Sequence, residues 1–229
     1  MRDFLRSTEA PAEAVVQAKA RATTVILGIA VAGVATGQRS VSFPTQDGGL
    51  VQADLYGASD RGVVLAHGGR FKKDSWEKQA QALVTAGFRA LAIEYREEGA
   101  HGGIDVLAAI HYLRKTGARS VSVVGASMGG DFGAEAAEEE PAAIDRLVLL
   151  ASGAYTPLLK MKGPKLFILA RDDANAEGPR LPKIRAQYEK ALEPKELILL
   201  DGSAHAQFLF ETDQGERVMR EILRFLTSK

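Results

Sequence analysis

The chain has 229 residues, 46% of them hydrophobic, and its 29 Lys and Arg residues balance 29 Asp and Glu residues. This length fits one α/β domain or two small ones, and the apolar fraction suffices for a single large core. The balanced charge argues against nucleic acid or an anionic membrane surface as the main partner, and the absence of cysteine excludes disulfides, thiolate metal sites and a cysteine nucleophile.

The first 38 residues carry an apolar segment, Thr23 to Thr36, that ends in small residues like a secretory signal. At about 14 residues it is shorter than a helix that spans a bilayer of ~30 Å. The stretch before it is longer and more acidic than an ordinary signal n-region. Taken together, these features favour an export signal. The alternative is a helical segment appended to a cytoplasmic protein. Membrane attachment is expected only if the segment is retained as an anchor. In either case, we expect the folded domain to cover residues 39–229.

From Arg39 onward, predicted strands and helices alternate. Residues 41–45 and 50–56 flank a Gln-Asp-Gly-Gly turn and predict an antiparallel hairpin. Short apolar runs predict six further buried strands, and apolar residues three and four apart predict helices between them. These later strands are expected at 62–66, 89–95, 120–124, 146–151, 165–170 and 196–200, and the helices at 76–86, 104–114, 127–138, 182–192 and 211–226.

Continuous apolar strands separated by helices are typical of a mostly parallel sheet that is covered on both faces. The sequence therefore predicts an α/β fold with eight strands, in which the opening hairpin adds antiparallel pairing at one edge. We find no internal repeat and no linker that would divide residues 39–229 into two domains.

Ser127 lies in the run Gly125-Ala126-Ser127-Met128-Gly129-Gly130, between a predicted strand and a predicted helix. In open α/β sheets, ligands bind at this carboxyl edge of the strands. The pattern G-x-S-x-G indicates a nucleophile elbow, in which the serine occupies a strained turn and its neighbours two residues away must be small. The structural alternative is a flavodoxin-like or Rossmann turn, but the dinucleotide pattern G-x-G-x-x-G does not fit here.

A serine hydroxyl requires a general base within hydrogen-bond reach. Among the four histidines, we assign this role to His205, because it follows the last strand in a loop of small residues at the same sheet edge as Ser127. His111 is expected on the side of a helix, and His101 is expected to cap one. His67 is expected to orient the loop after the third strand through hydrogen bonds.

The imidazole in turn requires a carboxylate that holds its tautomer. Asp172 and Asp173 both follow the seventh predicted strand at the carboxyl edge. The loop must turn away from the strand before it reaches the histidine, which favours Asp173. Asp172 is the alternative and would otherwise be a turn residue. The chain order Ser127, Asp173, His205 is the one expected for this type of site.

Acyl transfer also requires N–H donors that stabilise the oxyanion. One predicted donor is the amide of Met128, the residue after the serine. The other is expected from the loop after the third strand, where Gly69 is our choice and Arg70 the alternative, since glycines let the backbone approach closely. An ordinary glycine turn before a helix is the structural alternative. His67, Arg70 and Tyr155 are expected to line the site.

His67-Gly68-Gly69, the turn from Gly125 to Gly130, Asp173 and His205 together resemble the α/β-hydrolase superfamily, over about residues 41–229. Within it, the chain looks like the compact dienelactone-hydrolase-like and small esterase members. It departs from true dienelactone hydrolases, whose nucleophile is cysteine. The resemblance implies an eight-stranded sheet with the second strand antiparallel, hydrolysis through an acyl-enzyme, and no metal or organic cofactor.

Many members of that superfamily insert a cap domain after the sixth strand, and residues 152–163 are too few for one, so the site is expected to be open. The sequence predicts a serine hydrolase of the carboxylesterase type with a small-molecule acyl substrate. A peptidase, thioesterase or acyltransferase built on the same residues is one alternative, and a noncatalytic binding module is another. Arg70, Lys72 and Lys73 are interpreted either as attracting an anionic acyl group or as solvated surface.

Overall fold

The structure is a computed structural model, and it describes residues 37–153 and 155–228. The apolar segment at 23–36 lies outside these residues, as does the prediction that it is an export signal or an appended helix. In the described part of the chain, no helix is both long enough and apolar enough to cross a bilayer.

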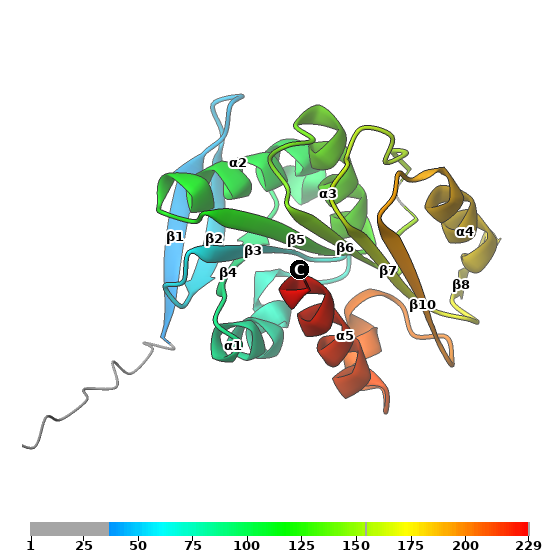
Figure 1. Cartoon of the computed structure of the whole chain (residues 1–229). Helices are drawn as coiled ribbons and strands as arrows, with labels where there is room; N and C mark the ends of the chain where they lie inside the picture. The colour runs from blue at the N-terminus through cyan, green and yellow to red at the C-terminus, as the bar shows by residue number, and fades with distance from the viewer. Residues whose placement is uncertain (1–36, 154, 229) are drawn as a thin grey trace, which may run out of the picture. The chain divides into compact units, whose positions relative to one another are not determined.

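Eight strands form one sheet, in the spatial order β1-β2-β4-β3-β5-β6-β7-β10 (Figure 1). Strand β2 pairs antiparallel with both β1 and β4, and every other neighbouring pair in this sheet is parallel. This confirms the predicted α/β class and the mostly parallel sheet with its antiparallel edge. The strands are β1 (Gln38–Pro44), β2 (Leu50–Tyr56), β3 (Arg61–Ala66), β4 (Arg89–Glu94), β5 (Ser120–Ala126), β6 (Arg146–Leu150), β7 (Lys165–Ala170) and β10 (Lys195–Leu200).

A small antiparallel pair, β8 (Ala174–Asn175) with β9 (Gly178–Pro179), forms in the loop after β7, where we expected no regular structure. The helices are α1 (Glu77–Thr85), α2 (Gly102–Lys115), α3 (Met128–Glu139), α4 (Leu181–Lys190) and α5 (Gly215–Thr227), with short 3-10 helices η1 (Lys73–Trp76), η2 (Glu97–Gly99) and η3 (Ala206–Glu211).

The last helix begins at Gly215, whereas the sequence predicts a start at 211. Residues 206–211 form η3 instead, and the chain then turns sharply, with the N–H of Gly215 donating to the carbonyl of Thr212. A Cβ at Gly215 would lie 2.3 Å from the carbonyl oxygen of Phe210. Only glycine fits this close approach. Gly215 therefore permits a tight turn at this point, and the turn ends η3 before α5 begins.

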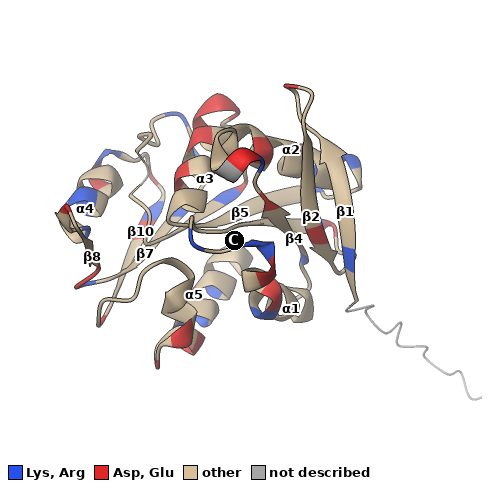
Figure 2. Ribbon diagram, turned by 180° about the vertical axis from the view of Figure 1, so that it is seen from behind, with Lys and Arg blue, Asp and Glu red and all other residues tan. Residues whose placement is uncertain are grey.

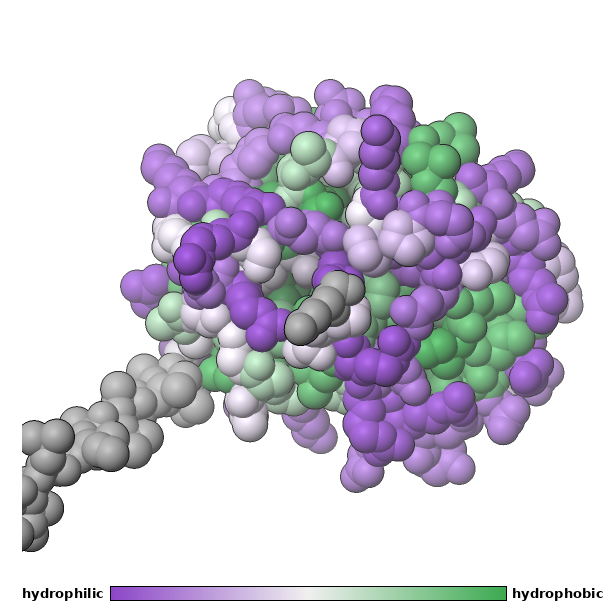
Figure 3. Space-filling view, viewed as in Figure 1, coloured by the Kyte–Doolittle hydropathy of each residue, from purple (hydrophilic) through white to green (hydrophobic). Residues whose placement is uncertain are grey.

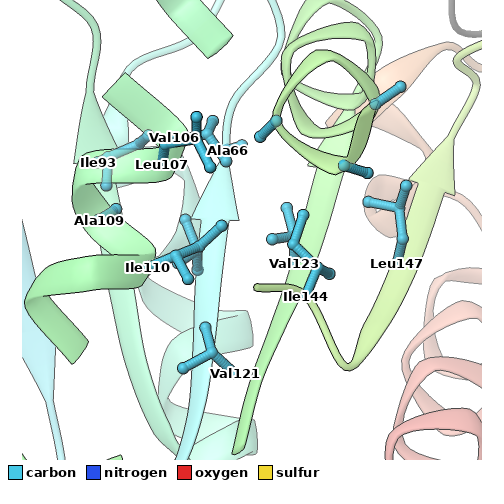
Figure 4. Packing of buried hydrophobic residues seen from close by; sticks show 14 of the residues in the cluster. Ala66, Ile93, Val106, Leu107, Ala109, Ile110, Val121, Val123, Ile144 and Leu147 are labelled. Atoms are coloured by element: carbon cyan, nitrogen blue, oxygen red, sulfur yellow. The ribbon is translucent and has the colours of Figure 1, made fainter. Parts of the chain in front are cut away.

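Alternating residues of the central strands contact opposite layers of helices. In β3, Val64 and Ala66 belong to the cluster that includes α2, α3 and α4, whereas Val63 and Leu65 belong to the cluster that includes α1 and α5. Figure 1 shows α2 and α3 above the sheet, with α1 and α5 below it, and Figure 4 shows Ala66 packed beside α2. Each fully buried aliphatic side chain contributes roughly 1.5–3 kcal/mol. Burial on both faces is why these strands are almost continuously apolar.

Charged residues lie mainly on the helices and loops, whereas most of the central sheet consists of other residues (Figure 2). Strand β10 closes one edge of the sheet, and its residues Leu197, Ile198 and Leu199 are only half-buried. Figure 3 shows an apolar area on the side of the molecule where Figure 1 places β10.

Candidate active site

Ser127 occupies a strained turn between the end of β5 and the start of α3. Its φ is 49° and its ψ is −118°, a conformation that costs a residue other than glycine about 1–3 kcal/mol. Backbone hydrogen bonds hold the turn in place. The N–H of Ser127 donates to the carbonyl of Leu150 at 2.8 Å, and its own carbonyl accepts from Gly130 at 2.8 Å and Asp131 at 3.1 Å. The surrounding structure therefore supports this strain and projects the side chain at the carboxyl edge of the sheet.

Close backbone packing explains the glycines around the serine. A Cβ at Gly125 would lie 2.3 Å from the carbonyl oxygen of Gly129, and a Cβ at Gly129 would lie 2.2 Å from that of Ala66. A Cβ at Gly130 would lie 2.5 Å from the Cβ of Ser152. Each distance is far below van der Waals contact, so the start of α3 packs against β3 and the end of β6 only because these side chains are absent.

Three polar side chains from separate parts of the chain are hydrogen-bonded in series. The Nε2 atom of His205 is 2.8 Å from Ser127 Oγ, and its Nδ1 atom is 2.7 Å from Asp173 Oδ2. Because an ionised carboxylate only accepts hydrogen bonds, this arrangement requires the proton on Nδ1 and leaves Nε2 to accept the Ser127 hydroxyl. The side chain of Asp173 is 1% exposed and that of His205 is 27% exposed. The carboxylate is therefore shielded from water, while the imidazole borders the cleft.

The loop after β7 separates the two adjacent aspartates. Asp172 is exposed, and its N–H donates to the carbonyl of Gly202, whereas Asp173 turns inward. The β8–β9 hairpin then returns the chain, and Arg180 closes over the buried carboxylate. Its N–H donates to the Asp173 carbonyl at 2.9 Å, and its Nε lies 3.3 Å from Asp173 Oδ1. No sequence pattern pairs Arg180 with Asp173, because the β8–β9 hairpin creates the contact.

The backbone amides of Gly69 and Met128 both border the cleft that contains Ser127 and His205. Neither N–H donates to an acceptor within the residues that the structure describes, and Met128 is the first residue of α3, where helical N–H groups lack an intrahelical partner. Both N–H groups are therefore unpaired within the described part of the chain, in residues that border the same cleft as Ser127.

Two side chains hold the loop that carries Gly69. Gln207 is 4% exposed, accepts from the N–H of Gly68 at 3.0 Å and donates to Ser75 Oγ at 2.9 Å. His67 lies with its Nδ1 2.9 Å from the carbonyl oxygen of Gly68. That carbonyl shares a peptide plane with the Gly69 N–H, so His67 restrains the direction in which this donor points. Gln207 was not among the predicted residues, since nothing in the sequence relates it to Gly68.

Two clefts meet at Ser127 and Met128. The first, of about 580 Å³, is bordered by His205, Arg70 and Phe208, and we call it the His205 cleft. The second, of about 540 Å³, is bordered by residues of α4 and by Tyr155 and Asp131, and we call it the α4 cleft. Arg70 and Tyr155 thus line the region where the sequence placed them. His67 borders a third, smaller hollow of about 390 Å³, which shares Gly69, Phe71 and Met128 with the His205 cleft.

The other two histidines lie away from Ser127. His101 stands at the N-cap position of α2, as predicted, and its carbonyl accepts from the N–H of Asp105 at 3.0 Å, although its side chain makes no capping hydrogen bond. Its ring nitrogens instead lie 3.4 Å from carboxylate oxygens of Asp47 and Glu97. His111 is exposed on α2, with Nε2 2.9 Å from a carboxylate oxygen of Glu140.

The basic residues of the loop after β3 do not act as one cluster. Lys73 forms an ion pair with the buried carboxylate of Asp54 on β2. Lys72 and Arg70 are exposed, and they border different hollows. The expectation that all three attract one anionic group therefore fails for Lys73, whose charge is already compensated.

The sheet order and the position of the strained serine define the α/β-hydrolase fold, in agreement with solved structures. An esterase from Pyrococcus furiosus superposes with a TM-score of 0.67 over 84% of this chain and 92% of its own, at 16% identity. For a dienelactone hydrolase from Anabaena variabilis, the TM-score is 0.69 over 82% and 96%, at 21% identity. For an esterase from Rhodococcus, it is 0.67 over 82% and 98%, at 15% identity. No protein-family model matches the sequence, and no curated protein is similar to it in sequence.

Proposed function

We propose that this protein is a serine hydrolase that cleaves carboxylic esters of small molecules through an acyl-enzyme intermediate. The observation that carries the proposal is the hydrogen-bonded series Ser127–His205–Asp173, which borders two clefts at the carboxyl edge of the sheet. The similar solved structures include esterases and a dienelactone hydrolase, which supports the same reaction class.

In the first half of the reaction, Ser127 Oγ attacks the ester carbonyl carbon while His205 Nε2 takes the hydroxyl proton. The carbonyl oxygen becomes an oxyanion, which accepts hydrogen bonds from the amides of Met128 and Gly69. One such donor is worth roughly 3 kcal/mol of transition-state stabilisation. Asp173 stabilises the imidazolium, and the alcohol leaves with the proton from Nε2.

In the second half, a water molecule occupies the position vacated by the alcohol. His205 Nε2 removes its proton as the water oxygen attacks the acyl carbon, and the same two amides stabilise the second oxyanion. Collapse of this intermediate returns the proton to Ser127 Oγ and releases the carboxylic acid. The side chains of this chain thus account for every proton transfer in the cycle.

A fluorophosphonate probe tests the proposal, because it phosphonylates only an activated serine. We expect wild-type protein to be labelled and Ser127→Ala to be unlabelled, with hydrolysis of p-nitrophenyl acetate reduced by about 10⁶-fold. Ser203→Ala, which removes a hydroxyl from the His205 cleft, is the matched control and should still be labelled. Folded wild-type protein that is neither labelled nor active on esters would support a noncatalytic binding module instead.

Matched ester, thioester and amide substrates then separate an esterase from a thioesterase or a peptidase.

A further inference from the structure

The two clefts that meet at Ser127 are not equivalent with respect to the proposed reaction. The departing alcohol must receive a proton from His205 Nε2, so its oxygen must come within about 3 Å of that atom. His205 borders the His205 cleft but not the α4 cleft. The leaving group of the substrate therefore extends into the His205 cleft, and the acyl chain extends into the α4 cleft.

The charges along the His205 cleft have one sign. Arg70 and Arg180 border it, and no Asp or Glu is among the described residues that line it. The Nε of Arg180 faces Asp173, whose carboxylate is itself buried and hydrogen-bonded to His205. Arg70 is exposed and forms no ion pair with any residue in the described ranges. The α4 cleft is bordered by both signs of charge, because Arg180 and Lys183 line it together with Asp131, whereas Arg70 borders the His205 cleft and not the α4 cleft.

Two aromatic rings give the same cleft an apolar part. The rings of Phe71 and Phe208 meet edge to face, with centroids 4.9 Å apart, and both border the His205 cleft. Phe208 remains 38% exposed. A positive charge next to an apolar surface interacts with an anion more strongly than one surrounded by water, and arginine pairs well with planar carboxylates.

We propose that the His205 cleft selects esters whose alcohol part carries a negative charge next to an apolar or aromatic body, with Arg70 as the residue that recognises the charge. This inference rests on the proposed function and extends it to the class of leaving group. Arg180 contributes to the same positive potential, but it also contacts Asp173, so a substitution there would disturb Asp173 as well. The test therefore changes Arg70.

Two acetyl esters that differ only in a remote charge provide the measurement. We compare 3-(4-acetoxyphenyl)propanoate, an anion, with its neutral propanamide, because the ester bond and the phenol are nearly the same in both. Wild-type protein should show a higher kcat/KM for the anion, and Arg70→Gln should reduce the anion-to-amide ratio by about tenfold, as expected for loss of a charged hydrogen-bonding group. Arg70→Glu should reduce the ratio further, and added salt should lower it in the wild type.

Lys72→Gln is the matched control, since it removes one positive charge from the same loop but borders a different hollow. Its anion-to-amide ratio should stay close to that of the wild type. A wild-type ratio near one, or an equal ratio in Arg70→Gln and wild type, overturns the inference while the proposed esterase stands. Hydrolysis of both esters no faster than by Ser127→Ala overturns the inference and the proposed function together.

Discussion

The two edges of the sheet handle backbone strain in different ways. At the amino edge, turns that need a positive φ use glycine, as at Gly87 before β4 and Gly117 before β5, and a Cβ at either position would meet open space. At the carboxyl edge, glycines such as Gly99 and Gly202 also adopt a positive φ, but there residues other than glycine adopt it as well. In the described part of the chain, all four such residues follow the carboxyl end of a strand: Glu97, Ser127, Ala151 and Ala206.

The same contrast extends to polar groups. At the amino edge, Asp145 accepts from the backbone N–H of Val121 at 2.6 Å and from Arg114 at 2.7 Å, which ties β5, β6 and α2 together. At the carboxyl edge, the Gly69 and Met128 amides have no acceptor among residues 37–153 and 155–228, and His205 borders an open cleft. Strain and unsatisfied groups persist only where packing elsewhere supports them. The comparison teaches that polar groups at one edge hold the fold together, whereas the other edge carries the strained serine and the open cleft on which the proposed function rests.

The largest expected effect comes from exchanging one carboxylate for an amide at each edge. Asp173→Asn should lower kcat/KM by about 10⁴-fold, because an amide no longer holds the His205 tautomer that leaves Nε2 unprotonated. Asp145→Asn should leave kcat/KM unchanged and lower the free energy of unfolding by about 1 kcal/mol, since its hydrogen bonds are weakened. Ester kinetics and urea unfolding of both variants check this. If Asp145→Asn lost activity without losing stability, the division between the edges would be wrong.

Adding a methyl group to one glycine at each edge should give the next largest effect. Gly129→Ala places a Cβ against the Ala66 carbonyl and should reduce the free energy of unfolding by about 3 kcal/mol or more. In Gly87→Ala, the new methyl group meets no neighbouring atom. The free energy of unfolding should therefore fall by only about 1 kcal/mol, the cost of a positive φ at alanine. Thermal unfolding followed by circular dichroism measures both. Equal losses would mean that the close approach of α3 to β3 is not a real constraint.

The strain at Ser127 can be measured by comparing two inactive variants. Ser127→Gly relieves the unfavourable φ and ψ, whereas Ser127→Ala retains them. We therefore expect the glycine variant to be the more stable of the two by about 1 kcal/mol, the reverse of the usual ranking. Both variants lack the hydroxyl, so the loss of its hydrogen bond to His205 cancels in the comparison. Urea unfolding that finds the alanine variant more stable would contradict a strained serine.

The smallest effect concerns pH and the ion pair that anchors the loop after β3. Burial by itself would raise the pKa of Asp54, but hydrogen bonds from Lys73 and Ser40 outweigh burial and leave that pKa below its ordinary value. A lowered pKa means that the stabilisation is complete above the unfolded-state pKa, near 4, and is lost as the pH falls below it. The difference in unfolding free energy between wild type and Asp54→Asn should accordingly shrink between about pH 5 and pH 3. A difference that stays constant over this range would contradict the lowered pKa.

The sequence by itself determined the elements whose signals are local. Continuous apolar runs predicted six strands of the main sheet, because strands buried on both faces carry few polar residues along their length, and the Gln-Asp-Gly-Gly turn predicted the hairpin of the other two. The turn around Ser127 was equally clear, since the glycines that the close packing of α3 requires are adjacent in the chain. The sequence also placed His101 correctly at the start of a helix, but it did not show that the ring lies beside the carboxylates of Asp47 and Glu97.

Only the tertiary structure decided the contacts between distant segments. The β8–β9 hairpin brings Arg180 over Asp173, and the turn after η3 delays the start of α5 until Gly215. Gln207 contacts Gly68 across 139 residues of chain. Such contacts leave no periodic or spacing signal, because they depend on how loops fold over one sheet edge, whereas strands and the serine turn follow from sterics and burial within a few residues.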